Sequence, residues 1–241
     1  MDEQSATDEQ KSQESPEGAA PGYGNGPGYW NARYEKDVEP FEWLETYADL
    51  HGMVEEATGG SHSSRVLHIG CGNSTWTEQM YDAGYQEILN IDTSDVVIRQ
   101  MISRNKDRPG MIFEEMDATK MTIEDNSFDL ALDKSVLDTF ACTDSAMLTI
   151  ATYLKEVTRV LRPGGVFLCI SYGAPDTRTV FFQLPHLDWS YRQVEIPPKQ
   201  AGGGTHWAYI CHLNETPGGG GVIPWAELEK SLKSPMPSLR P

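Results

Sequence analysis

The stretch VLHIGCGNS (residues 66–74) predicts a buried β-strand that runs directly into the loop Gly70-x-Gly72, with a helix behind it. Strand, glycine loop and helix in this order are typical of open α/β sheets, in which ligands bind at the carboxyl ends of the strands. A glycine lets the backbone approach a ligand closely, because a Cβ would clash there. A tight strand-to-helix turn without a ligand is the alternative, and Gly-x-Gly alone does not separate the two interpretations.

Two acidic residues stand at the ends of the next two predicted strands. Asp92 closes the run ILNID and lies 20 residues after Gly72, an offset at which a carboxylate can accept both ribose hydroxyls of a nucleoside. Asp117 ends the following strand, where a carboxylate can accept from an adenine amino group. Each acid alone is equally compatible with a helix cap or a turn. Together with the glycine loop, they predict a nucleoside pocket.

The glycine loop also indicates which nucleoside is bound. Dinucleotide-binding loops carry a third glycine three residues after the second, and Thr75 stands at that position here. The sequence also has no Gly-x-x-x-x-Gly-Lys-Ser/Thr loop for a triphosphate. S-adenosylmethionine has a ribose and an adenine but no phosphate, and it fits the pattern best.

The alternation of short apolar runs with helical patterns predicts an α/β fold, a Rossmann-like doubly wound sheet with mostly parallel strands. Two consecutive strands near the C-terminus, without a helix between them, predict an antiparallel hairpin at one edge, which gives about seven strands. The expected strands cover residues 65–69, 87–91, 111–116, 127–133, 166–172, 190–195 and 205–213, and the expected helices cover residues 74–83, 94–105 and 147–161. Pro40 is expected in the first turn of a further helix.

The domain organisation follows from composition. Residues 1–28 contain six acidic residues and one lysine, with almost nothing large and apolar before Tyr23, so we expect a disordered acidic head. The folded domain is expected over residues 29–213. Residues 214–241 are expected to form a weakly ordered tail, with one helical turn near residues 225–232.

The charge of the chain limits its partners. The 241 residues include 19 Lys+Arg and 36 Asp+Glu, a net charge of −17, of which −5 falls in the acidic head and −12 in the remainder. This argues against nucleic acid and against an anionic membrane as partners. A basic protein fits, and so does acidity that serves only solubility. The four scattered cysteines and the lack of a long apolar run lead us to expect a cytoplasmic protein without a metal site.

Taken together, the motifs resemble class I S-adenosylmethionine-dependent methyltransferases. More narrowly, they resemble the eukaryotic methyltransferase-like group that includes lysine methyltransferases of translation elongation factor 1-alpha. The motifs that carry the resemblance are YWNARY (29–34), FEWL (41–44), GCGNS (70–74), NIDTSDVVI (90–98), MDATKM (116–121), SFDLALDKSVLD (127–138), EVTRVLRPGG (156–165) and ISYGAP (170–175). Two positions depart from the pattern: His68 stands where many class I enzymes have an acid, and Ser135-Val136 replaces the usual Gly-Thr.

The resemblance implies which residues bind the cofactor S-adenosylmethionine. Gly70, with Gly72 beside it in the loop, is implied to line the methionine part. Asp92 is implied to hold the ribose, and Asp117 with Ala118 the adenine.

Three N-terminal aromatic residues, Trp30, Tyr34 and Trp43, are implied to close over the cofactor. Aromatic faces beside a sulfonium form a cation–π arrangement, which agrees with this role. Ordinary core packing is the alternative for these side chains.

The resemblance also implies methyl transfer, most directly to lysine on a basic protein such as translation elongation factor 1-alpha. Asp133 and Lys134 follow the fourth strand, beside the methyl donor in this fold, and we expect these two residues to shape the donor end of the pocket. A local ion pair at a helix start is the alternative for them. Two other hypotheses stay open: a small-molecule methyltransferase, and a module that binds the cofactor without catalysis.

Overall fold

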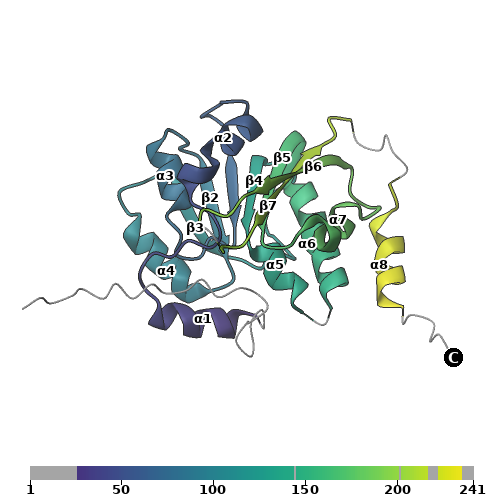
Figure 1. Cartoon of the computed structure of the whole chain (residues 1–241), viewed down its shortest axis with the longest axis horizontal. Helices are drawn as coiled ribbons and strands as arrows, with labels where there is room; N and C mark the ends of the chain where they lie inside the picture. The colour runs from purple at the N-terminus through teal and green to yellow at the C-terminus, as the bar shows by residue number, and fades with distance from the viewer. Residues whose placement is uncertain (1–25, 144, 201, 217–221, 235–241) are drawn as a thin grey trace, which may run out of the picture.

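A seven-stranded sheet forms the centre of the molecule (Figure 1). The structure is a computed structural model and describes residues 26–143, 145–200, 202–216 and 222–234. The strands are β1 (Val66–Ile69), β2 (Ile88–Asp92), β3 (Met111–Glu115), β4 (Phe128–Lys134), β5 (Leu161–Ser171), β6 (Trp189–Ile196) and β7 (His206–Leu213). They lie in the order β3-β2-β1-β4-β5-β7-β6, with β1 to β5 parallel and β7 antiparallel to both of its neighbours. The predicted fold class is confirmed.

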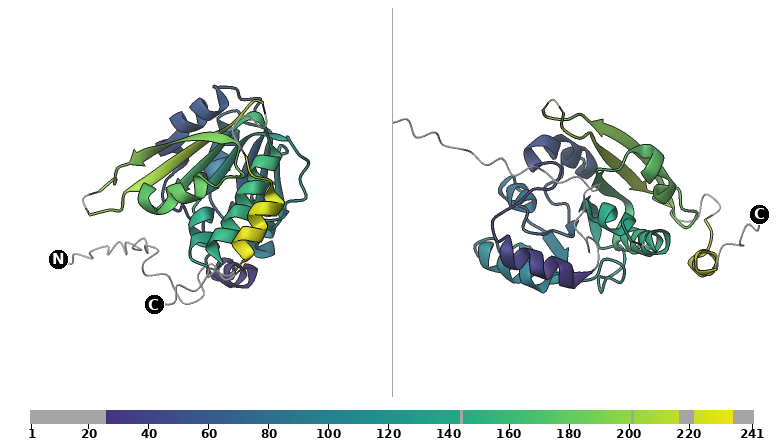
Figure 2. Two further views of the ribbon diagram at one scale, coloured as in Figure 1. Left: turned by 90° about the vertical axis from the view of Figure 1, so that its right-hand side faces the viewer. Right: turned by 60° about the horizontal axis from the view of Figure 1, so that its bottom comes forward.

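Helices cover both faces of the sheet (Figure 2). The helices are α1 (Pro27–Lys36), α2 (Tyr47–Thr58), α3 (Trp76–Asp82), α4 (Asp95–Arg104), α5 (Val136–Ala141), α6 (Ala146–Val160), α7 (Pro175–Phe182) and α8 (Trp225–Lys233). Buried side chains of α2, α3 and α4 pack on one face together with Leu130 and Leu132 of β4. Those of α5, α6 and α7 pack on the other face with Ala131. Successive residues of β4 therefore serve opposite layers, as the period of two along a strand requires.

Strand β4 is buried along its whole length because it lies inside a sheet that is covered on both sides. Its last two residues, Asp133 and Lys134, are therefore ionisable side chains that are buried at the carboxyl edge of the sheet. This edge is also reached by the glycine loop after β1 and by the end of β2, since the three strands are parallel neighbours. The first β-α turn and the turn after β4 thus lie side by side.

Several local predictions need correction. Pro40 lies in the connector (residues 37–46) between α1 and α2, and α2 begins only at Tyr47. The backbone N–H of Thr46 donates to the Asp49 carboxylate (2.8 Å), a local contact that starts the helix there. The short helices α5 and α7 were not predicted, although Pro175 at the first position of α7 is a recognised start signal. The expected helical turn near residue 225 is a helix of nine residues.

Some predictions fall outside the described residues. The acidic head lies there up to residue 25, and so do residues 217–221 and 235–241 of the predicted tail. Helix α1 begins at Pro27, inside the stretch that we assigned to the head. In the part of the chain that the structure describes, no helix has the length and apolar character needed to cross a membrane.

Candidate functional site

A cavity of about 320 Å³ lies at the carboxyl edge of the sheet. All eight residues that the sequence predicted to bind the cofactor line it, and all eight lie between positions 30 and 118. These residues are Trp30, Tyr34, Trp43, Gly70, Gly72, Asp92, Asp117 and Ala118. Lys134 also lines the cavity, whereas Asp133 does not. The volume lies within the range of small-ligand pockets, which begins at about 300 Å³.

The two glycines of the first loop adopt a left-handed backbone, with φ +61° at Gly70 and +51° at Gly72. A Cβ on Gly70 would lie 2.2 Å from a methyl group of Val136, and one on Gly72 would lie 2.6 Å from the Tyr34 hydroxyl oxygen. The sequence predicted close approach of a ligand to these glycines. The structure adds a second reason for them, because the start of α5 and the ring from α1 both close against this loop.

Asp92 is buried on the wall of the cavity. Its carboxylate accepts hydrogen bonds from the backbone N–H of Gly72 and of Ser94, each at 2.9 Å. Burial raises the pKa of Asp92 to about 6, although these N–H donors act against the rise. A carboxylate has room for about four hydrogen bonds, so Asp92 keeps acceptor capacity for hydroxyl groups in the cavity.

Asp117 and Ala118 follow β3 on the same edge of the cavity. The Asp117 carboxylate accepts hydrogen bonds from the backbone N–H (2.9 Å) and hydroxyl (2.7 Å) of Thr119. The turn role that we gave as an alternative is therefore present together with the pocket position. Ala118 is buried and contributes a small apolar surface.

Aromatic side chains form the N-terminal wall of the cavity. Trp30 and Tyr34 are four residues apart on α1 and stack with their ring centroids 6.1 Å apart. Trp43 packs edge-on against Phe41, and the Arg33 guanidinium lies 4.9 Å from the Trp43 ring centroid. Helix α1, which carries Trp30 and Tyr34, lies beside α4 (Figures 1 and 2).

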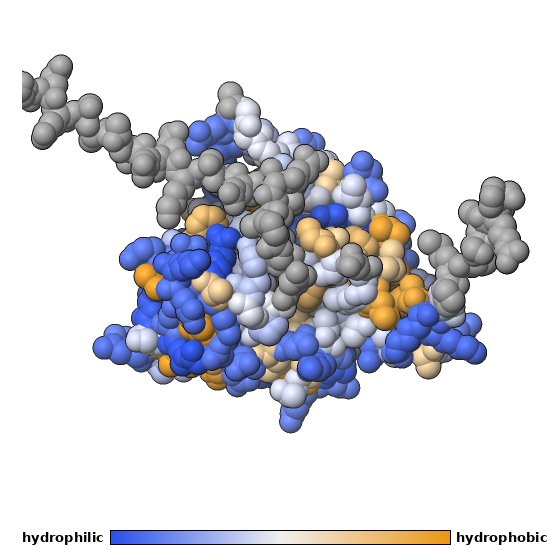
Figure 3. Space-filling view, turned by 90° about the horizontal axis from the view of Figure 1, so that it is seen from below, coloured by the Kyte–Doolittle hydropathy of each residue, from blue (hydrophilic) through white to orange (hydrophobic). Residues whose placement is uncertain are grey.

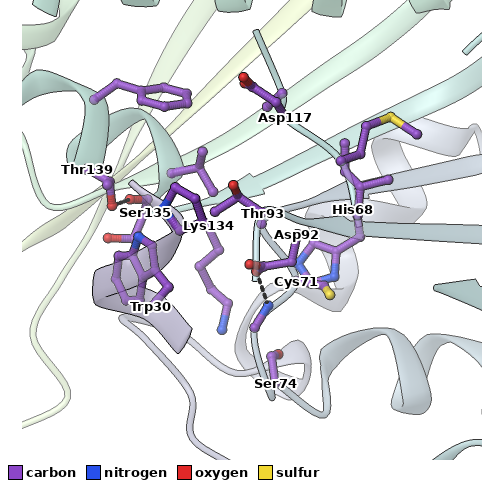
Figure 4. A pocket seen from close by; sticks show the side chains of 18 of the residues that line it. Trp30, His68, Cys71, Ser74, Asp92, Thr93, Asp117, Lys134, Ser135 and Thr139 are labelled. Atoms are coloured by element: carbon purple, nitrogen blue, oxygen red, sulfur yellow. Dashed lines mark hydrogen bonds between the residues drawn. The ribbon is translucent and has the colours of Figure 1, made fainter. Parts of the chain in front are cut away.

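Lys134 projects into the cavity region between Trp30 and Asp92 (Figure 4). Its ammonium pairs with the carboxylate of Glu42, a residue of the connector that also accepts from the backbone N–H of Thr75 (2.6 Å). Burial lowers the pKa of Lys134, and the Glu42 charge opposes that change. The ion pair that we considered for Lys134 thus exists, but its partner comes from the connector and not from the adjacent helix start.

Asp133, unlike Lys134, does not line the cavity, so it can shape the donor end of the pocket only through its neighbours. Its side chain is fully buried and turned toward the other layer, where it accepts from the N–H of Val136 (2.8 Å), the N–H of Leu137 (3.1 Å) and the hydroxyl of Tyr153 (2.8 Å). Burial raises its pKa to about 7. Asp133 therefore caps α5 and positions the loop that faces the cavity.

Sequence reasoning missed Glu42 and the role of Ser135 in the cavity wall. Ser135 has φ +73°, and its carbonyl accepts from the Thr139 hydroxyl at 3.1 Å (Figure 4). The departure from glycine at this position was the available signal. His68, the other departure, lines the cavity as a neutral ring, because burial lowers its pKa to about 4.

Comparison with known proteins identifies the family. The model for the methyltransferase domain matches residues 67–169. The chain is 30% identical over 176 residues to "EEF1A lysine methyltransferase 4" of Bos taurus, a match that covers 69% of this chain and 68% of that protein. The chain belongs to the class I S-adenosylmethionine-dependent methyltransferases.

Longer relatives are more similar to this methyltransferase over a shorter stretch. It is 45% identical over 148 residues to the "eEF1A lysine and N-terminal methyltransferase" of Bos taurus and 44% identical to that of Homo sapiens. Each match covers 59% of this chain but only 21% of the relative. The chain therefore spans about a fifth of the length of these relatives.

Solved structures show the same fold at low sequence identity. The N-methyltransferase NodS from Bradyrhizobium japonicum in complex with S-adenosyl-L-homocysteine has a TM-score of 0.59 at 17% identity, over 76% of this methyltransferase and 98% of that chain. The [4+2]-cyclase SpnF has a TM-score of 0.61 at 14% identity, over 77% and 96%.

The groups around the cavity of this methyltransferase fit S-adenosylmethionine. The cofactor needs an acceptor for two ribose hydroxyls, a slot for an apolar ring and electron-rich surface near a sulfonium. The buried Asp92 carboxylate can be the acceptor, and the small side chain of Ala118 leaves room for the ring. The rings of Trp30 and Tyr34 provide the electron-rich surface. Within the described residues, no group of three or more His, Cys, Asp or Glu side chains is placed to hold a metal ion.

Proposed function

We propose that this methyltransferase transfers a methyl group to lysine on a basic protein, with eEF1A as the first candidate substrate, in the cytoplasm. The observation that carries the proposal is the 45% identity, over 148 residues, to a relative named as an eEF1A lysine and N-terminal methyltransferase. The net charge of −17 supports a cationic protein partner and speaks against nucleic acid or an anionic membrane. The face that carries α1 is hydrophilic over much of its area (Figure 3).

In this proposal the residues of the chain bind and orient the cofactor. Asp92 accepts from the ribose hydroxyls, Asp117 and Ala118 contact the adenine, and Gly70 and Gly72 line the methionine part. When bound, S-adenosylmethionine supplies a methyl group on a positively charged sulfur.

The chain must also exclude water and admit a neutral lysine. The rings of Trp30, Tyr34 and Trp43 line the cavity, and in this proposal they shield the bound cofactor from solvent. A lysine with the ordinary pKa of about 10.4 costs roughly 5 kcal/mol to deprotonate at neutral pH. An apolar cavity lowers this cost, because desolvation disfavours the ammonium. Asp133 faces the opposite layer and therefore does not act as the proton acceptor in the cavity.

Cofactor affinity should depend on pH through Asp92. Because its pKa is raised to about 6, the carboxylate becomes protonated between pH 7 and pH 5 and accepts hydroxyl donors less well. We expect the dissociation constant for S-adenosylmethionine to rise about tenfold over this interval, measured by calorimetry. Asp92→Asn should bind weakly with no such pH dependence, and an equal slope in both proteins would contradict the assignment.

The same raised pKa has the opposite sign for folding of the cofactor-free protein. The stability that Asp92 contributes is fully present below its unfolded pKa near 3.8 and is lost as the pH rises through about 6. A weaker cofactor affinity at pH 5 therefore does not reflect unfolding caused by this group.

Labelled S-adenosylmethionine tests the proposed function directly. The purified chain is incubated with the labelled cofactor and either purified eEF1A or a cell lysate, with Asp92→Ala as the inactive control. One labelled protein band that contains methyllysine supports the proposal. Label only in small molecules supports the small-molecule hypothesis, and cofactor binding without any label supports a binding module.

Salt should slow the reaction on a protein substrate. If the acidic surface attracts a lysine-rich partner, added salt screens that attraction within a Debye length of about 8–10 Å near physiological ionic strength. We expect kcat/KM for the protein to fall as salt rises from 50 to about 300 mM, while the dissociation constant for the cofactor changes little. Constant turnover across this range would mean that the acidity serves solubility.

A further inference from the structure

The connector (residues 37–46) is fixed to the body of the domain by two carboxylates on either side of Trp43. Glu42 pairs with Lys134 at the end of β4. Glu45 reaches the opposite side and contacts His206 of β7 and Lys199 of the β6–β7 loop. Glu45 does not line the cavity, so direct contact with the cofactor does not explain why a carboxylate is buried there.

The backbone between Trp43 and Glu45 makes an unusually tight turn. The N–H of Glu45 donates to the carbonyl of Trp43 at 2.7 Å, which closes a three-residue turn around Leu44. Leu44 has φ +59°, a left-handed conformation that is unfavourable for a residue with a Cβ. Such a conformation persists only where the surrounding structure holds it.

The side chain of Glu45 supplies a fixed point next to this turn. It is 2% exposed, and its two oxygens lie 2.7 Å from His206 Nδ1 and 2.9 Å from Lys199 Nζ. Because a carboxylate can only accept, His206 donates from Nδ1. His206 is itself buried at the start of β7, and its ring packs against that of Tyr172. The carboxylate is therefore tied to the rigid antiparallel part of the sheet.

We propose that Glu45 is a positioning residue for cofactor binding. The contact between its carboxylate and His206 keeps Leu44 in its strained turn, and this turn keeps the Trp43 ring at the cavity wall. When this contact is lost, Leu44 relaxes toward an ordinary backbone conformation and the Trp43 ring leaves its place. The inference rests on the proposed function only in that the cavity binds S-adenosylmethionine, and not on the identity of the methyl acceptor.

Calorimetry with S-adenosylmethionine tests this role. Glu45→Ala should raise the dissociation constant about tenfold, because the released turn no longer presents Trp43. Glu45→Gln should fall between this variant and the parent, since the amide oxygen still accepts from His206. With a methyl acceptor, KM for the cofactor should rise while kcat at saturating cofactor stays within about twofold. Glu56→Ala is the control, because Glu56 on α2 also pairs with the β6–β7 hairpin, through Arg192 at 2.6 Å, but lies at the surface and away from Trp43.

A double-mutant cycle separates positioning from general stability. In a Trp43→Ala background, adding Glu45→Ala should weaken cofactor binding by less than about twofold further, because the effect passes through the missing ring. Additive losses, or a Glu45→Ala variant with the affinity of the parent, would overturn the proposal. Should Glu45→Ala fail to fold, His206→Ala breaks the same contact from β7 and enters the same cycle. A parent that binds the cofactor but methylates no protein contradicts the proposed function and leaves this test intact.

Discussion

Replacing Asp92 with alanine is expected to weaken S-adenosylmethionine binding by about 100-fold or more. The substitution removes the acceptor for two ribose hydroxyls, and a hydrogen bond to a charged group contributes about 1.5–3 kcal/mol. It also leaves the backbone N–H groups of Gly72 and Ser94 without their carboxylate. Calorimetry with the cofactor measures the loss.

Unfolding of the cofactor-free protein separates this effect from a damaged fold. The hydrogen bonds that the Asp92 carboxylate accepts stabilise the fold. The desolvation of this carboxylate, which raises its pKa, opposes that stabilisation. We therefore expect the loss in the unfolding free energy to stay at about 1–2 kcal/mol. Asp82→Ala is a suitable control, because Asp82 pairs with Arg108 at the surface. An Asp92→Ala protein that binds the cofactor like the parent would refute the ribose assignment and with it the site.

Gly70→Ala is expected to lower the unfolding free energy by about 3 kcal/mol and to abolish measurable cofactor binding. Two effects add up at this position. The new methyl group would lie 2.2 Å from a methyl of Val136, and alanine is unfavourable at φ +61°. Denaturant unfolding and calorimetry measure the two losses.

The chain offers a matched control for the backbone part of this effect. Gly59 has almost the same φ, +59°, but a Cβ there meets nothing within 4 Å. Gly59→Ala should therefore cost only about 1 kcal/mol. Combining Gly70→Ala with Val136→Ala should recover part of the difference, because it removes the colliding methyl. Equal losses for Gly70→Ala and Gly59→Ala would mean that the contact with α5 is irrelevant.

Five of the eight predicted cofactor-binding residues could be predicted because each stands at or shortly after the end of a strand, whereas Trp30, Tyr34 and Trp43 came from the family resemblance. Parallel strands bring their carboxyl ends to one edge, so Gly70, Asp92 and Asp117 were expected together from local patterns alone, and all three line the cavity. Asp133 also stands near the end of a strand, β4, yet its side chain points to the other layer. Alternation along β4 sends neighbouring residues to opposite faces, and the sequence around Asp133 does not reveal which face holds the ligand.

The pairs that fix the N-terminal wall could not be predicted from one sequence. Glu42 pairs with Lys134, which is 92 residues away in the sequence, and Glu45 pairs with His206, which is 161 residues away. Periodicity reports only which residues share a face of one element, so it contains no information on such partners. The helix α5 was missed for a related reason, since its six residues are too few to show a period.

The connector has a consequence for the order in which the protein becomes competent during synthesis. Trp30, Tyr34 and Trp43 leave the ribosome early, but the residues that hold the connector in place, Lys134 and His206, are made much later. Contacts so distant in sequence form late, because the intervening chain must first be ordered. A nascent chain that has exposed only its first half has the aromatic residues and the glycine loop but lacks Lys134 and His206, the partners that hold the connector. Both carboxylates of the connector are therefore paired only when β7, the last strand in the sequence, has been added.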